Sequence, residues 1–163
     1  SAQTLADHLF NTTSISPILI YTSPFLRATE TASILHSVLT AAAPVPHIIP
    51  TPITTPTLSE RFFGYFELCS PSDSIYASVW AEDAQDGYHT RWNVESCVSV
   101  RDRTASLVQN IVEPSVAAHA IILVAHGDAL QILQTAFEDV PVEQHRSLRH
   151  VETAEWREMR SEG

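Results

Sequence analysis

Short apolar runs and amphipathic segments alternate along the chain, in the order typical of an α/β domain. The runs at residues 18–22 and 120–125 are rich in Ile, Leu and Val, and they are apolar on both faces, as buried parallel strands are. A helical pattern follows each run directly, at residues 23–39 and 129–137. The sequence therefore predicts a parallel sheet with helices packed against it.

Two of the predicted helices have clear core faces. The chain opens with an amphipathic helix that places Leu5, Leu9 and Phe10 on one side. The helix after the first strand is expected to begin with Ser23 as N-cap and Pro24 as its first residue. Its expected core face consists of apolar residues at helical spacing, namely Leu26, Ile34, Leu35 and Val38.

The other segments are less regular. Five prolines within residues 44–56 exclude a helix and favour an extended connector with at most a short edge strand. Residues 68–95 mix turn residues with aromatic ones, which predicts a lid or insertion containing a short helix near 74–84. A further helix is expected over 98–112. The last segment, 151–159, is compatible with either a helix or a strand.

Composition narrows the classes of protein. The 163 residues, 44% of them hydrophobic, fit a single globular domain over 1–163, and no apolar stretch is long enough for a membrane span. A net charge of −10 disfavours nucleic acid but leaves small phosphorylated molecules possible. Two cysteines, Cys69 and Cys97, form no disulfide framework, and a reducing, cytoplasmic location is favoured. Because the only methionine is Met159, we expect a chain processed, truncated or cut from a longer protein.

Several kinds of site are excluded by motif. The only glycines are Gly64, Gly87, Gly127 and Gly163, so the sequence holds no dinucleotide fingerprint, P-loop or Gly-x-Ser-x-Gly elbow. None of the eight histidines forms a His-x-x-x-His pair, and neither a metal site nor a cofactor is expected.

His126 is the leading candidate for a functional residue. It stands at the carboxyl end of the most apolar strand, where open α/β sheets place their ligand crevice. Gly127 allows a bound group to approach the backbone, and the N-terminus of the next helix favours an anion. The alternative is a histidine that merely ends a strand.

Two further charged residues are candidates for the same site. Arg27, in the first turn of a helix that follows a strand, can project over the same edge of the sheet. Glu60 and Arg61 precede Phe62 and Phe63, and packing beside these rings would raise a carboxyl pKa as a general acid requires. The alternatives are a solvated surface arginine and an ordinary surface Glu-Arg pair.

Taken in order, these strings resemble the motifs of the histidine phosphatase superfamily, which includes phosphoglycerate mutases. Residues 23–32, Ser-Pro-Phe-Leu-Arg-Ala-Thr-Glu-Thr-Ala, resemble the family's Ser-Pro-x-x-Arg-Ala-x-Glu-Thr-Ala motif. Residues 58–67 resemble its Leu-x-Glu-Arg-x-x-Gly-x-x-Glu segment, and Val-Ala-His-Gly at 124–127 resembles its second active-site histidine. Glu95-Ser96 is similar to the pair that precedes a family helix.

The resemblance implies a fold and a set of roles. The fold is a three-layer sandwich with a mostly parallel central sheet and helices on both faces. Arg27 would grip the phosphoryl group, His126 would stabilise its charge beside Gly127, and Glu60 would protonate the leaving oxygen, with Arg61 facing the substrate. The implied partner is a small phosphorylated substrate or a phosphate ion, with no metal and no cofactor.

The sequence departs from the family in one respect. Family members open with a strand followed by Arg-His-Gly, whose histidine takes the phosphoryl group, and these 163 residues contain no such tripeptide. We therefore expect a fold that misses its first strand and exposes backbone groups beside the strand ending at His126. A separate segment or a second chain would fill that gap, or the domain is damaged.

Three functional hypotheses follow from this departure. The first is a phosphatase that hydrolyses phosphomonoesters through a phosphohistidine supplied by a segment absent from the chain, which alone would have little activity. The second is an inactive pseudophosphatase that binds phosphate or protein, with the aromatic residues between Tyr76 and Trp92 as an interaction surface. The third is an α/β domain without retained function.

Overall fold

A parallel sheet forms the centre of the molecule. The computed structural model describes residues 1–12, 18–44, 49–67, 69, 73–112 and 120–160. Within them, β1 (Ile18–Thr22), β2 (Ile53–Thr54) and β3 (Ala120–Val124) form a three-stranded sheet in the order β2-β1-β3. All neighbours are parallel, and β1 and β3 pair from Ile18 opposite Ala120 to Thr22 opposite Val124. Both strands match the predicted runs, so the predicted α/β fold is confirmed.

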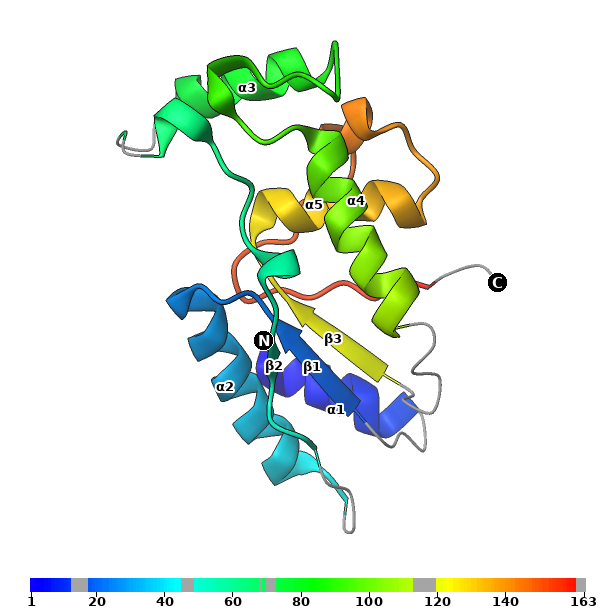
Figure 1. Ribbon diagram of the computed structural model, residues 1–163. Coiled ribbons are helices and arrows are strands. Elements are labelled where there is room, and N and C mark those ends of the chain that lie inside the picture. The colour runs from blue at the N-terminus through cyan, green and yellow to red at the C-terminus, as the bar shows by residue number, and fades with distance from the viewer. Residues whose placement is uncertain (13–17, 45–48, 68, 70–72, 113–119, 161–163) are drawn as a thin grey trace.

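Helices cover the sheet and extend beyond the carboxyl ends of its strands (Figure 1). Their bounds are α1 (Ala2–Thr12), α2 (Leu26–Ala42), α3 (Asp73–Asp83), α4 (Cys97–Leu107) with a π-helical turn (Val108–Val112), and α5 (Gly127–Phe137). Residues of α1 and α2 share a core with one face of the sheet, while Leu107 of α4 packs against the other. In Figure 1, α3 lies farthest from the strands. None of the described helices is both long and apolar enough to cross a membrane.

The two faces of β1 explain this layering. Ile18 and Ile20 point into the core shared with α1 and α2, whereas Leu19 and Tyr21 point to the opposite side, beside Leu107. This alternation follows from the two-residue repeat of a strand, and it requires apolar residues at every position of a strand covered on both faces.

β3 is less buried than its apolar composition indicates, and its open edge is the one expected beside the strand that ends at His126. Every residue of β3 is only partly buried, whereas four of the five residues of β1 are buried. The physical reason is position, because β3 ends the strand order and no strand among the described residues pairs with its outer edge. A groove of about 1130 Å³ runs beside this edge, between α1 and residues 150–160.

The start and the core face of α2 also differ from the prediction. The helix begins at Leu26, and its N-cap position is Phe25 without a side-chain cap, so Ser23 and Pro24 precede the helix. Leu26 and Ile34 are 72% and 63% exposed. Two of the predicted residues are correct, since Leu35 is buried in the core and Val38 packs against it, and the other buried residues of the helix are Ala28, Ala32 and Leu39. Small alanines on this face let the helix approach α1 closely, which apolar volume alone did not indicate.

The C-terminal segment forms neither of the two predicted structures. Residues 151–160 contain a turn and otherwise no regular structure. Trp156 packs against the core beside α1, with its ring centroid 4.8 Å from that of His8. Arg157 binds Gln134 and Glu138 on α5. Side-chain contacts to two helices therefore hold this segment extended.

The predicted helix near residues 74–84 is present as α3, and the aromatic residues around it form a small core. Phe63, Val79 and Val94 are buried together, and Tyr76 packs edge-on against Phe63 with a centroid separation of 5.0 Å. Gly64, at φ +57°, makes the tight approach possible, because a Cβ there would lie 2.2 Å from the carbonyl oxygen of Trp92. Most of these aromatic side chains therefore contact one another, and fewer of them are open to a partner than the hypothesis of an interaction surface between Tyr76 and Trp92 requires.

Candidate active site

His126 occupies the expected position at the end of β3, where it is the N-cap residue of α5. Its Nδ1 accepts a hydrogen bond from Arg27 Nε at 3.1 Å, and its Nε2 lies 2.8 Å from Ser23 Oγ. Since a guanidinium only donates, Nδ1 carries no proton, and Nε2–H donates to the serine. Burial, and next the charge of Arg27, lower the pKa of His126 to about 4. The ring is therefore neutral at physiological pH.

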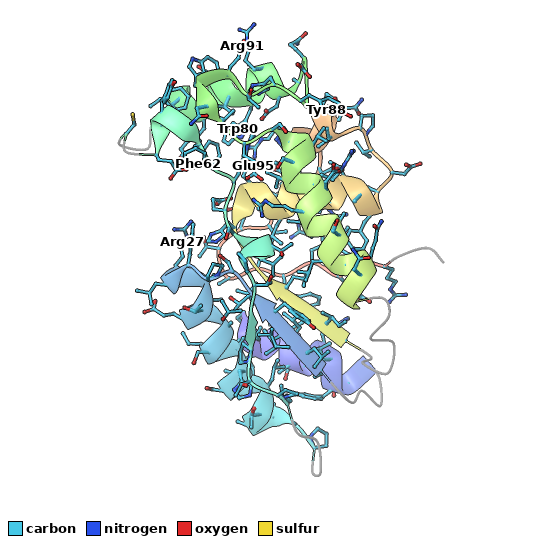
Figure 2. All side chains as sticks on the ribbon, viewed as in Figure 1. Arg27, Phe62, Trp80, Tyr88, Arg91 and Glu95 are labelled. Atoms are coloured by element: carbon cyan, nitrogen blue, oxygen red, sulfur yellow. The ribbon has the colours of Figure 1, made fainter. Side chains whose placement is uncertain are left out.

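Arg27 lies in the first turn of α2 and is exposed (Figure 2). Its guanidinium carbon stands 5.4 Å from the centre of the Phe25 ring. Within the described part of the chain, its two terminal nitrogens have no hydrogen-bond partner, so they can bind an anion entering from solvent.

Glu60 completes the group. It follows the short helix η1 (Pro56–Leu58), and its Oε1 accepts the backbone N–H of Arg61 at 2.9 Å. Its Oε2 lies 3.9 Å from His126 Nδ1. Burial raises the pKa of Glu60 to about 7, and the nearby charge of Asp128 raises it further, against the opposing Arg61 N–H bond and Arg27 charge. A carboxyl of this kind keeps its proton into the neutral range and can act as a general acid.

The cause of this raised pKa differs in part from the expected one. Phe62 is 48% exposed, and Phe63 belongs to the small core beside α3. The two rings that follow Glu60 in the sequence therefore do not jointly enclose it. The groove beside β3 is lined by Arg27, Glu60, His126 and Gly127. The structure thus brings these predicted residues to one site.

The raised pKa of Glu60 predicts a dependence of stability on pH. Because the folded pKa of about 7 exceeds the unfolded value of 4.5, the folded state holds this proton more tightly. The associated stability is complete below pH 4.5 and is lost as the pH rises through 7. Relative to Glu60→Gln, wild type should lose about 2–3 kcal/mol of unfolding free energy across this range.

Urea unfolding of both proteins at several pH values measures this loss. Glu30→Gln, on the exposed surface of α2, is the matched control that gives the baseline. A difference between wild type and Glu60→Gln that stays constant from pH 4.5 to 7 would contradict the assignment of a buried, proton-holding carboxyl.

The His150 ring lies directly against the backbone of Gly127. A Cβ at this position would lie 2.7 Å from Cε1 of His150, whose ring also lines the groove. Neither His150 nor Ser23 was predicted at the site. Ser23 was interpreted as a helix cap, and its Oγ instead accepts the Phe25 N–H at 3.3 Å and contacts His126. No sequence pattern around His150 indicated its position.

Arg61 does not face the substrate side as the sequence suggested. It is 1% exposed, and its two terminal nitrogens donate to the two oxygens of Asp83 at 2.7 and 2.8 Å. Its Nε donates to the carbonyl of Glu95 at 2.7 Å. A buried guanidinium needs such paired acceptors, and Asp83, at the end of α3, supplies them. Arg61 therefore fastens α3 to the body of the domain.

Arg103 of α4 holds the loop that carries Glu60. Its guanidinium binds the Glu95 carboxylate at 2.8 and 3.1 Å, and it donates to the carbonyl of Thr57 at 2.6 Å. Figure 2 shows Glu95 close to the start of α4, where Ser96 Oγ caps the helix by accepting the Ser99 N–H. The Glu-Ser pair noted in the sequence thus starts α4 and positions the arginine that supports Glu60.

The family assignment comes from comparison of the sequence with known families. Residues 1–163 match the model of the histidine phosphatase superfamily (branch 1). The chain belongs to this superfamily. No curated protein sequence matches it.

Solved structures share the histidine phosphatase fold. YhfR of Bacillus stearothermophilus is 26% identical, with a TM-score of 0.64, over 92% of this chain and 69% of that one. Mycobacterial glucosyl-3-phosphoglycerate phosphatase in complex with VO3 is 21% identical, with a TM-score of 0.67, over 92% and 70%. The same mycobacterial enzyme with inorganic phosphate is 22% identical, with a TM-score of 0.63, over 92% and 71%.

Proposed function

We propose that this chain forms the phosphate-binding part and the proton donor of a phosphomonoesterase, and that a histidine outside the 163 residues is the nucleophile. The observation that carries the proposal is the meeting of Arg27, Glu60 and His126 on one groove, where the pKa of the Glu60 carboxyl is raised to about 7 and the imidazole of His126 is neutral near pH 7. Support also comes from a structural relative that is a phosphatase solved with inorganic phosphate.

The proposed reaction has two steps. The nucleophilic histidine attacks phosphorus, the bond to the leaving oxygen breaks, and Glu60 gives that oxygen its proton. Water then attacks the phosphorus of the phosphohistidine, the phosphorus–nitrogen bond breaks to release free histidine and phosphate, and the Glu60 carboxylate accepts the proton from the water. Arg27 and His126 stabilise the negative charge on the phosphoryl oxygens in both steps.

Phosphate binding requires one local change. In the present state Arg27 donates to Nδ1 of His126, so this nitrogen has no proton to offer an anion. A bound phosphate dianion would raise the pKa of His126 by adding negative charge and would attract the Arg27 guanidinium. With both changes, the Arg27 guanidinium and the protonated His126 ring can each donate a hydrogen bond to the phosphate.

The open edge of β3 suggests where the nucleophile enters. Its outer backbone groups face the groove that holds Glu60 and His126, and Ser1 also lines this groove. We propose that a strand ending in Arg-His-Gly, from an additional segment or a second chain, pairs with this edge. Its histidine would then lie at the carboxyl end of the sheet, beside His126.

We also propose that residues 68–95 act as a lid over the substrate. The contact that supports this role is the Arg61–Asp83 pair, which joins the end of α3 to the residue that directly follows Glu60. A substrate that contacts and moves α3 would thereby shift Arg61, and with it the position of Glu60, the proposed general acid.

Phosphate binding tests the site without requiring turnover. Replacing Arg27 by alanine is expected to weaken phosphate binding about 10- to 100-fold, because it removes a charge-assisted pair. Isothermal titration of the 163-residue chain with inorganic phosphate measures this change. Arg91→Ala is the matched control, since Arg91 is exposed, pairs with Glu82 at 3.2 Å and lies far from Arg27 (Figure 2). Equal phosphate affinity in both variants would remove Arg27 from the site.

A pseudophosphatase is the second candidate function. It is favoured by the Arg27–His126 pair, which needs no nucleophile in order to bind a phosphate ion. Both candidates bind phosphate, and they differ only in whether any segment supplies the nucleophile.

A further inference from the structure

A second group of reactive side chains lies buried in the domain, apart from the groove beside β3. Asp83 ends α3, Cys97 begins α4, and His145 belongs to the short helix η6 (Val142–Ser147). All three residues have 0% exposure. One potential ligand atom from each lies within 4.8 Å of the others. A carboxylate, a thiol and an imidazole from three separate elements thus meet in the interior.

His145 has an unpartnered nitrogen that points into this cluster. Its Nδ1 lies 3.0 Å from the carbonyl oxygen of Val142, which can only accept, so Nδ1 carries the proton. The lone pair on Nε2 is then free, and this buried atom has no hydrogen-bond partner among the described residues. It lies 3.9 Å from Asp83 Oδ2 and 4.0 Å from Asp128 Oδ1. These carboxylate oxygens are acceptors as well, so a cation is the missing partner.

This hydrogen-bond arrangement is the one that metal-binding histidines adopt. A ligating imidazole usually donates its second N–H to a carboxylate or a backbone carbonyl, which fixes the tautomer and aims the other nitrogen at the metal. The Val142 carbonyl holds His145 in this way. Arg61 plays the equivalent part for Asp83, because its two N–H bonds fix the plane of the carboxylate.

The charges of the cluster also call for a cation. Asp83 and Asp128 are both buried. The buried Arg61 pairs with both of them, and the partly exposed Arg146 lies 4.0 Å from Asp128. His89 accepts the Arg91 N–H at Nδ1, and its Nε2 donates to Asp83 at 2.7 Å. Among the buried groups, the two carboxylates therefore face the single positive charge of Arg61. A divalent cation that displaces the thiol proton of Cys97 adds two positive charges and one negative charge, which makes the cluster neutral.

We propose that Asp83, Cys97 and His145 bind a structural zinc ion that fastens α3 to α4 and η6. The mixed sulfur, nitrogen and oxygen donors suit zinc, which accepts all three. Ligand atoms about 2.0–2.3 Å from zinc lie roughly 3.5 Å apart, so distances within the cluster must shorten by at most about 1.3 Å. Binding releases the Cys97 proton to solvent.

No sequence motif reveals this site, because its residues come from three segments that are far apart in the sequence. Cys97 Sγ lies 3.9 Å from the imidazole of His145, measured at Nδ1, although the two residues are 48 positions apart. The ligands appear together only after α3 has folded back over α4 through the Arg61–Asp83 pair.

Zinc content and stability test the proposal on the 163-residue chain. After incubation with zinc chloride and dialysis, we expect one zinc per chain in wild type and a melting temperature several degrees above that of the metal-free protein. Cys97→Ser and His145→Gln should lose both properties. Cys69→Ser is the matched control, since Cys69 is the exposed cysteine, and it should behave as wild type does.

Cobalt provides a test that does not depend on the folding of the variants. Wild type loaded with cobalt(II) should show a thiolate-to-cobalt charge-transfer band that Cys69→Ser retains. Absence of this band, no zinc retained by wild type, or equal zinc in Cys97→Ser would each overturn the proposal.

Discussion

Joining a segment that ends a strand with Arg-His-Gly ahead of Ser1 is expected to raise aryl phosphate hydrolysis by at least about 10³-fold, because covalent catalysis depends on its nucleophile. Ser1 lines the groove beside β3, so a flexible linker can reach the open edge. Steady-state release of the aryl alcohol measures the gain.

The matched control is the same fusion with Arg-Ala-Gly. This protein should pair with β3 equally well, yet it should hydrolyse no faster than the unfused chain. The unfused chain itself should be no faster than its His126→Ala variant, since His126 binds charge and is not the proposed nucleophile. Strong turnover by the unfused chain would contradict the need for a separate histidine. Equal rates for both fusions would favour a pseudophosphatase.

Replacing Arg61 by alanine is expected to lower the free energy of unfolding by about 3–5 kcal/mol. The change leaves the carboxylate of Asp83 buried with His89 and Cys97 as donors but without a charged partner, and it also removes the buried cation beside Asp128. Urea unfolding at pH 7 measures the loss. Phosphate affinity should change little under conditions where the variant is folded.

Arg91→Ala serves as the control for a surface ion pair. The Arg91 side chain is 65% exposed, and its pair with Glu82 is expected to contribute less than about 1 kcal/mol. If Arg61→Ala were as stable as this control but bound phosphate poorly, Arg61 would belong to the substrate side, as the sequence first suggested.

The sequence predicts the strands and the site well because both depend on local order. Runs of Ile, Leu and Val define β1 and β3, and parallel strands place their carboxyl ends on one edge. Arg27 and His126 each follow such a strand, so their contact at 3.1 Å follows from topology. The position of Glu60 required the family resemblance, since its supporting contacts come from Arg103, far along the chain.

The failures share a physical cause, which is that a residue's surroundings depend on elements far away in the sequence. β3 has the composition of a buried strand, but its burial depends on a neighbour on each side. Leu26 and Ile34 are as apolar as Leu35, and only the place of α1 decides which face of α2 is covered. Arg61 follows a proposed acid in the sequence, yet the return of α3 turns it inward to Asp83.

The open edge of β3 has a consequence for the behaviour of the protein in concentrated solution. Its sequence, Ala-Ile-Ile-Leu-Val, has no charge and no proline, the two features that usually protect an edge strand from other chains. Uncharged segments of high strand propensity are the ones that stack into amyloid-like fibrils. The strand that would complete the active site is therefore also the cap that keeps the molecule from self-templated aggregation.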